Sequence, residues 1–232
     1  MDLSQRSTEE ELMNEATVSA EDYARCLRDL AVVNRVTFTH HATLRWLTRA
    51  TRDLPQGARV SILDVACGDG DLLRAIHRWA ERRGLQASLE GIDLNPRSAA
   101  EAAAATPDGM AIACRTGDVF DYVPDPAPDF IVSSQFAHHL TDAELVRLLG
   151  WLERHAGRGW FIADLHRHVL PYYGFRVLAW IARWHRIIRI DGTISVARSF
   201  RRADWTRLLA EAGVDARVSW HMPFRLCVGR LK

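Results

Sequence analysis

Short apolar segments alternate with amphipathic segments through the middle of this chain. Apolar runs that end in small or acidic residues predict strands, and runs with apolar residues three or four apart predict helices. The predicted strands cover about 60–65, 87–93, 111–115, 130–134, 160–164, 216–220 and 224–229, and the predicted helices between them about 70–82, 96–105, 141–156 and 200–213. This order predicts a doubly wound α/β sheet of mainly parallel strands, with a ligand at their carboxyl ends.

Two further segments flank this alternation. Helical spacing predicts an N-terminal helical cap over residues 1–55, followed by an α/β domain over 56–232. Residues 166–195 are expected to form an irregular insert, rich in aromatic residues and arginine, with apolar positions around most of a helix. Three interpretations stay open for it: a lid, a pocket for an aromatic or lipid-like ligand, and a helix that touches a membrane surface. Its arginines suit a carboxylate or phosphate on that ligand.

The turn after the first predicted strand carries the first candidate chemistry. Asp64 is followed by small residues at every second place, Ala66, Gly68 and Gly70, so that a ligand can approach the backbone closely. Asp93 ends the next strand, where a carboxylate accepts hydrogen bonds from both hydroxyls of a ribose. Asp118 follows the third strand and is placed to accept from an adenine amino group. Together they predict a nucleoside-like cofactor.

A dinucleotide is the rival cofactor. Its fingerprint requires a glycine or alanine three residues after the second glycine, for close packing of helix on strand. Leu73 occupies that place here, and the Asp64 carboxylate would repel a pyrophosphate. The turn therefore favours a cofactor other than NAD.

The ordered motifs over about 58–165 resemble class I S-adenosylmethionine-dependent methyltransferases, in particular the quinone, polyketide and sugar methyltransferases. The resemblance implies a seven-stranded sheet with the last strand antiparallel and S-adenosyl-L-methionine as cofactor. It implies that Asp64 orders the methionine end, Asp93 holds the ribose, and Ser134 lies beside the sulfonium. The cofactor-binding residues would be Asp64, Ala66, Cys67, Gly68, Gly70, Asp93, Leu94, Asp118, Val119 and Ser134. Ala66 departs from the family, which usually has glycine there.

Histidines at the same edge of the sheet are candidates for the general base that a hydroxyl acceptor needs. His138 and His139 follow the fourth strand, and Asp164, His166 and His168 end or follow the fifth. We expect His139 to be the base, His138 its helper or substitute, Asp164 the carboxylate that orients one imidazole, and His166 a reserve. No metal site is expected, because no third ligand joins His166 and His168 at a convincing spacing.

Composition limits the remaining choices. The net charge of +1 gives no reason to expect nucleic acid as a partner. Four cysteines without a CxxC pair, and no visible secretory signal or membrane span, indicate a cytoplasmic protein without stable membrane insertion; a homodimer stays possible.

The expected function is transfer of a methyl group to a small hydrophobic acceptor in secondary metabolism, with an aromatic hydroxyl as the preferred acceptor group. The alternatives are C-methylation of a polyketide or quinone-like acceptor, an NAD-dependent oxidoreductase and a non-catalytic binding module.

Overall fold

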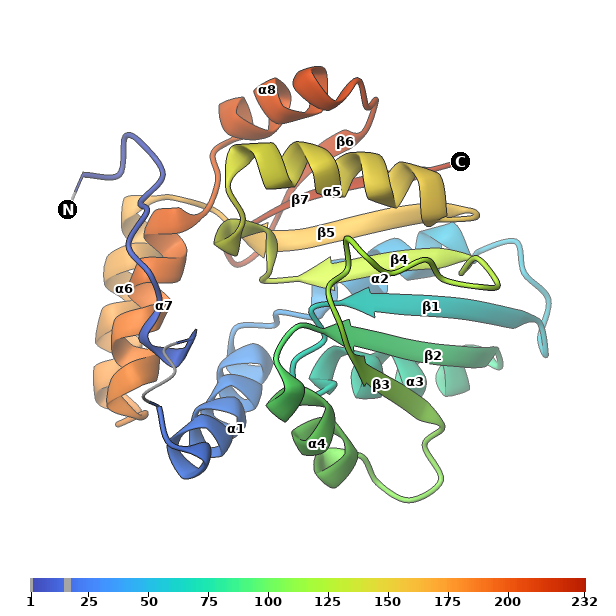
Figure 1. Cartoon of the computed structure of the whole chain (residues 1–232), viewed down its shortest axis with the longest axis horizontal. Helices are drawn as coiled ribbons and strands as arrows, with labels where there is room; N and C mark the ends of the chain where they lie inside the picture. The colour runs from blue at the N-terminus through green and yellow to red at the C-terminus, as the bar shows by residue number, and fades with distance from the viewer. Residues whose placement is uncertain (1, 15–17) are drawn as a thin grey trace.

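A computed structural model of the chain describes residues 2–14 and 18–232, and a seven-stranded sheet forms its centre (Figure 1). The strands lie in the order β3-β2-β1-β4-β5-β7-β6. Their bounds are β1 Arg59–Val65, β2 Gln86–Asp93, β3 Ile112–Thr116, β4 Phe130–Ser134, β5 Gly159–Leu165, β6 Arg217–His221 and β7 Arg225–Leu231. β7 pairs antiparallel with both of its neighbours, whereas β1 to β5 pair parallel. The predicted fold class and its antiparallel last strand are confirmed.

Helices cover both faces of the sheet because its strands are apolar on both sides. On β1, Val60 and Ile62 pack into one core with α2 and α3, and Leu63 and Val65 pack into a second core with α5 and α8. These helices are α2 His41–Ala50, α3 Asp71–Arg83, α5 Asp142–His155 and α8 Arg202–Ala212, and α4 Pro96–Ala105 packs beside β2 and β3. A capping box of Thr141 and Glu144 starts α5.

The segment after β5 is not irregular, so that part of the prediction is wrong, whereas its predicted helical character is confirmed. It forms two packed helices, α6 (Val169–Ile181) and α7 (Arg186–Arg198). Between them, Arg183 takes a left-handed backbone with φ of 53°, which reverses the chain. Buried Trp184 follows and packs against Phe175 of α6 with the rings tilted, so the apolar residues of the segment hold the two helices together.

α1 (Ala20–Val36) joins this helical pair at the carboxyl ends of the strands (Figure 1). Its Cys26 and Val33 pack in one cluster with residues of α6 and α7. The short 3-10 helix Leu12–Asn14 also packs on α7. α2, which the sequence places in the cap, contributes Ala42 and Leu47 to the core under the sheet. Met1 and residues 15–17 of the predicted cap lie outside the described residues.

Candidate active site

A cleft of about 650 Å³ opens at the carboxyl ends of β1, β2 and β3. Its lining includes six of the predicted cofactor residues: Ala66, Gly68, Asp93, Leu94, Asp118 and Val119. The other four lie next to it without lining it: Asp64 and Cys67 are buried, Gly70 caps α3, and Ser134 ends β4. A cleft of this size suits a ligand as large as a nucleoside with an amino acid attached.

The Asp93 carboxylate is fixed at the bottom of this cleft by backbone donors. The N–H of Gly68 donates to one carboxylate oxygen and the N–H of Asn95 to the other, each at 2.9 Å. Ala66 and Gly68 both have left-handed backbones, with φ of 60° and 54°, which tighten the turn. Each carboxylate oxygen keeps a lone pair, so Asp93 still has acceptors for a diol.

Two buried oxygens beside the cleft have no partner among the described residues. They are Oδ1 of Asp64 and the hydroxyl of Ser134. Burial, and then the nearby Cys114 and Asp93, raise the pKa of Asp64 well above its usual value. An unpaired buried acceptor is costly, and a donor from a bound ligand or a water removes that cost. The cleft therefore fits S-adenosylmethionine, whose amino group is such a donor.

The strain at Ala66 gives a first testable prediction. A left-handed backbone costs an alanine roughly 1–2 kcal/mol, whereas the added freedom of glycine in the unfolded chain costs about 0.4–1 kcal/mol. Ala66→Gly should therefore raise the free energy of unfolding by up to about 1 kcal/mol. Denaturant titration measures this, and a clear loss of stability would show that the Ala66 methyl group packs in the fold.

A buried group of side chains lies where β4 and β5 end. Nδ1 of His138 lies 2.8 Å from Oδ1 of Asp164, and its backbone N–H donates to the other oxygen of Asp164 at 3.0 Å. On the far side of the ring, Nε2 of His138 lies 3.3 Å from the carboxylate of Glu11. His138 is therefore held between two carboxylates, and Asp164 orients His138 rather than His139.

These contacts fix the protonation of His138. Burial alone lowers the pKa of His138, but the Asp164 and Glu11 carboxylates outweigh it and raise this pKa to about 9. Burial would raise the pKa of Glu11, but its hydrogen bond to His138 and the nearby His139 lower it to about 2. Asp164 likewise has a lowered pKa, because the charge and hydrogen bond of His138 outweigh its burial. Near neutral pH, His138 is thus an imidazolium between two carboxylates.

His139 has the opposite character. Burial and the charge on His138 lower the pKa of His139 to about 4, so its imidazole is neutral near pH 7. Its side chain is 29% exposed and lines the cofactor cleft, and its Nε2 lies 3.7 Å from Glu11. A neutral imidazole at the cleft can accept a proton, and the Glu11 carboxylate would stabilise the charge formed.

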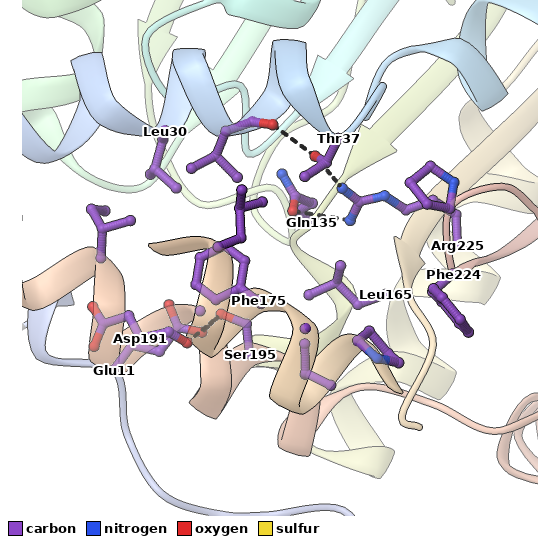
Figure 2. A pocket seen from close by; sticks show the side chains of 18 of the residues that line it. Glu11, Leu30, Thr37, Gln135, Leu165, Phe175, Asp191, Ser195, Phe224 and Arg225 are labelled. Atoms are coloured by element: carbon purple, nitrogen blue, oxygen red, sulfur yellow. Dashed lines mark hydrogen bonds between the residues drawn. The ribbon is translucent and has the colours of Figure 1, made fainter. Parts of the chain in front are cut away.

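A second cavity, the apolar pocket, lies between α1, α6 and α7 and has a volume of about 260 Å³ (Figure 2). Leu30, Leu165 and Phe175 supply its apolar wall. Polar groups stand on opposite sides of it: Glu11, Asp191 and Ser195 on one, and Thr37, Gln135 and Arg225 on the other. The Ser195 hydroxyl donates to Glu11 at 2.6 Å, and the buried Arg225 donates to Gln135 and Thr37 at 3.2 and 3.1 Å.

The two cavities adjoin. Met13 and Gln135 line both of them, and Glu11, which lines the apolar pocket, reaches toward His139 in the cofactor cleft. A ligand group that projects from the apolar pocket toward Glu11 therefore comes close to His139 at the edge of the cofactor cleft. This is the arrangement that transfer between two ligands requires.

Sequence reasoning missed Glu11, Gln135 and Arg225. The acidic N-terminal segment shows no periodicity, and no spacing pattern links Glu11 to the histidines. The reserve base His166 lies outside the lining of both cavities, with its Nδ1 buried and unpaired among the described groups. Nδ1 of His168 accepts from the N–H of Leu170 and so caps α6.

Residues 62–171 match the family model described as a methyltransferase domain. The match spans the cofactor turn, the Asp93 strand and both histidines after β4. Residues 62–171 therefore form a methyltransferase domain, and the sheet order and the two adjoining cavities agree with a class I S-adenosylmethionine-dependent enzyme.

Solved structures with the same fold carry related descriptions. The plantazolicin methyltransferase BpumL in complex with SAH has a TM-score of 0.66 at 15% identity, with 91% of this chain and 90% of that chain covered. Human N-acetylserotonin methyltransferase with SAM has a TM-score of 0.63 at 14% identity, with 92% and 56% covered. Magnesium protoporphyrin IX methyltransferase from Synechocystis PCC 6803 with bound SAH has a TM-score of 0.53 at 18% identity, with 84% and 82% covered. No curated protein matches the sequence significantly.

Proposed function

We propose that this enzyme methylates a hydroxyl group, in the first place an aromatic one, on a small apolar acceptor held in the apolar pocket. The observation that carries the proposal is the position of His139. This neutral imidazole lines the cofactor cleft and faces Glu11, which lines the apolar pocket. A base at the junction of the two cavities is what deprotonation of a hydroxyl during transfer needs.

The cofactor supplies an electrophilic methyl group on a sulfonium, and the chain supplies the residues that bind both ligands and the base. In this proposal Asp93 holds the ribose, Asp118 and Val119 frame the adenine, and Asp64 and Ser134 serve the methionine end and the sulfonium. The solved neighbours support the choice of cofactor in this proposal, because three of them are described with SAM or SAH bound.

The acceptor is defined by the size and lining of the apolar pocket. Its volume of about 260 Å³ exceeds the roughly 150 Å³ of an engineered cavity that holds benzene, so it admits more than a single ring. Its largely apolar wall selects a hydrophobic body, and the polar groups on opposite sides select oxygens at the ends of that body. The substrates in the neighbours' names, N-acetylserotonin, a porphyrin and plantazolicin, include ring systems of very different sizes.

Incubation with isotopically labelled S-adenosylmethionine and a panel of phenols, quinols and polyketides tests the proposal. We expect a mass gain of one methyl group, located on oxygen by the chemical shift of the labelled carbon. A methyl group on carbon would overturn O-methylation in favour of the C-methylation alternative. No transfer to any hydroxyl while S-adenosylhomocysteine binds tightly would contradict the choice of acceptor.

The role of Asp93 can be measured separately. Loss of its charged hydrogen bonds should weaken S-adenosylhomocysteine binding by about 1.5–3 kcal/mol, which is roughly a 10- to 150-fold rise in Kd. Because Asp93 also accepts from the backbone of the turn, Asp93→Asn is the better variant and Asp93→Ala the second. Titration calorimetry with S-adenosylhomocysteine and with NADH gives the answer. Tight NADH binding with no response to S-adenosylhomocysteine would exclude the proposed cofactor.

A further inference from the structure

Helix α6 presents an apolar surface to solvent. Seven of its 13 residues are large apolar side chains that stay exposed: Val169, Leu170, Tyr173, Val177, Leu178, Trp180 and Ile181. Val169, Tyr173, Val177 and Ile181 are four residues apart and therefore share one face of the helix. Trp180 is 67% exposed and Ile181 64%. Soluble proteins rarely leave so many adjacent large apolar groups uncovered unless the surface binds a partner.

Arginines border this apolar surface. Arg176, Arg186 and Arg189 line a groove together with Tyr173 and Trp180. Arg183 and Arg189 border a second hollow with Trp180 and Ile181. These four arginines are exposed, and none forms an ion pair with a described residue. The sequence over 169–190 contains no acidic residue, so the surface is apolar and positively charged.

This charge identifies the kind of partner. In a two-fold dimer through α6, the arginines of one copy would face those of the other, which is unfavourable. An anionic bilayer instead offers negative charge to the arginines and an apolar interior to the side chains between them. Tryptophan and tyrosine are the residues that favour the boundary between lipid and water. None of the described helices is long and apolar enough to cross a membrane, and α6 has 13 residues. We therefore expect α6 to lie along the surface of the bilayer rather than to cross it.

The apolar pocket adjoins the same helix. Leu170, Gly174 and Leu178 of α6 line that pocket and are themselves exposed. A hydrophobic molecule in the outer part of a bilayer would therefore meet the pocket wall without first crossing water. We propose that α6 and its flanking arginines dock this enzyme on anionic membrane surfaces, and that the acceptor enters the apolar pocket from the lipid. The docking is independent of the proposed reaction, whereas the entry of the acceptor rests on it.

Sedimentation with lipid vesicles tests the docking without cofactor or acceptor. The full chain should bind vesicles of phosphatidylcholine with 30% phosphatidylglycerol, bind pure phosphatidylcholine more weakly, and be released as salt rises from about 0.1 to 0.5 M. Brominated lipids should quench tryptophan fluorescence of the bound protein. The variant Trp180→Asp/Ile181→Asp should lose at least tenfold in partitioning. Arg176→Glu/Arg189→Glu should lose a similar factor at low salt.

The matched control is Val123→Asp/Leu231→Asp, which removes comparable exposed apolar surface from outside α6 and α7 and should bind as wild type does. Methyl transfer to a water-soluble phenol should be unchanged in the Trp180/Ile181 variant, so a failure of docking is distinct from a failure of the proposed function. Absence of binding to phosphatidylglycerol vesicles, or binding that neither variant lowers, would overturn the proposal. A dimer that Trp180→Asp/Ile181→Asp dissociates would assign α6 to a second copy, and capture of an acidic protein without vesicle binding would assign it to a protein partner.

Discussion

The variant His139→Ala is expected to lose about 10²–10⁴-fold in turnover while its affinity for S-adenosylhomocysteine changes little. The reason is that His139 is the neutral imidazole at the junction of the cofactor cleft and the apolar pocket. Removing it leaves the proton of the acceptor hydroxyl beside the Glu11 carboxylate alone, which is a weaker base because its pKa is about 2. Steady-state kinetics and calorimetry on the same preparation separate the effect on kcat from that on binding.

A matched control comes from elsewhere in the chain. His155 at the end of α5 lines neither cavity, and His155→Ala should turn over as wild type does. An acceptor that is already ionised needs no base, so the defect of His139→Ala should shrink as pH rises past the pKa of the acceptor. If His139→Ala keeps turnover within a few-fold of wild type at pH 7 as well as pH 8, the assignment of the base is wrong.

The surroundings of His138 change its expected part in this reaction. Both ring nitrogens face carboxylates, so His138 has no free edge to offer an acceptor and cannot replace His139 as base. We infer that it is a positioning residue, which keeps Glu11 next to His139. The double variant His138→Ala/His139→Ala should therefore lose little more turnover than His139→Ala alone, because the two histidines act as one unit.

The second large effect concerns stability. Asp164→Ala is expected to lower the free energy of unfolding by roughly 3–5 kcal/mol, because it leaves a buried imidazolium without one of its two carboxylates. Asp164 is fully buried and also accepts from the backbone N–H groups of His138 and Leu165. For a chain of this size, the melting temperature should fall by about 6–20 °C. Thermal unfolding followed by circular dichroism measures it.

Asp142→Ala is the matched control, since the Asp142 carboxylate and its pair with Arg207 are exposed, while the part-buried Arg6 keeps backbone carbonyl oxygens as partners, so the loss should cost about 1 kcal/mol or less. The pH dependence supplies an independent check. The pKa of His138 is raised by folding to about 9, so its contribution is fully present below about pH 6.5 and is lost as pH rises through 9. That loss should be smaller in Asp164→Ala. Equal destabilisation of both variants, with the same pH profile, would contradict the buried ion pair.

The parts of this molecule that follow from local chemistry were predictable. The capping box of Thr141, the glycine that ends α3 and the apolar run of β1 depend on residues that lie close together in the sequence. The cofactor turn belongs to the same class, because its small residues and Asp93 follow a fixed strand–turn–helix spacing. These features predict a ligand site at the carboxyl ends of the strands, and a cleft lies there.

The partners of the catalytic candidates were not predictable, because they depend on contacts between distant segments. Glu11 reaches the histidines only because α7 holds the N-terminal segment, where Asp191 accepts from the backbone of Leu12 and Met13. The histidine partner of Asp164 was not predictable for the same reason. The sequence indicated a carboxylate beside an imidazole, but His138 and His139 are adjacent, so it did not show which of the two imidazoles Asp164 would contact. Arg225 lies on the last strand, where its burial followed from the order β5-β7-β6 and not from its neighbours in sequence.

The apolar pocket has polar groups on opposite sides, and this arrangement bears on regioselectivity. An acceptor with an oxygen at each end can place one beside Glu11 and His139, while Arg225, Gln135 and Thr37 receive the other. Arg225 donates and carries a charge, so it prefers a carbonyl or carboxylate oxygen to a hydroxyl. A molecule with one hydroxyl and one carbonyl would therefore bind in a single orientation. With two equivalent hydroxyls, the first methylation would replace a donor with a methoxy group, and the product would still have to turn end for end before the second hydroxyl could meet the base.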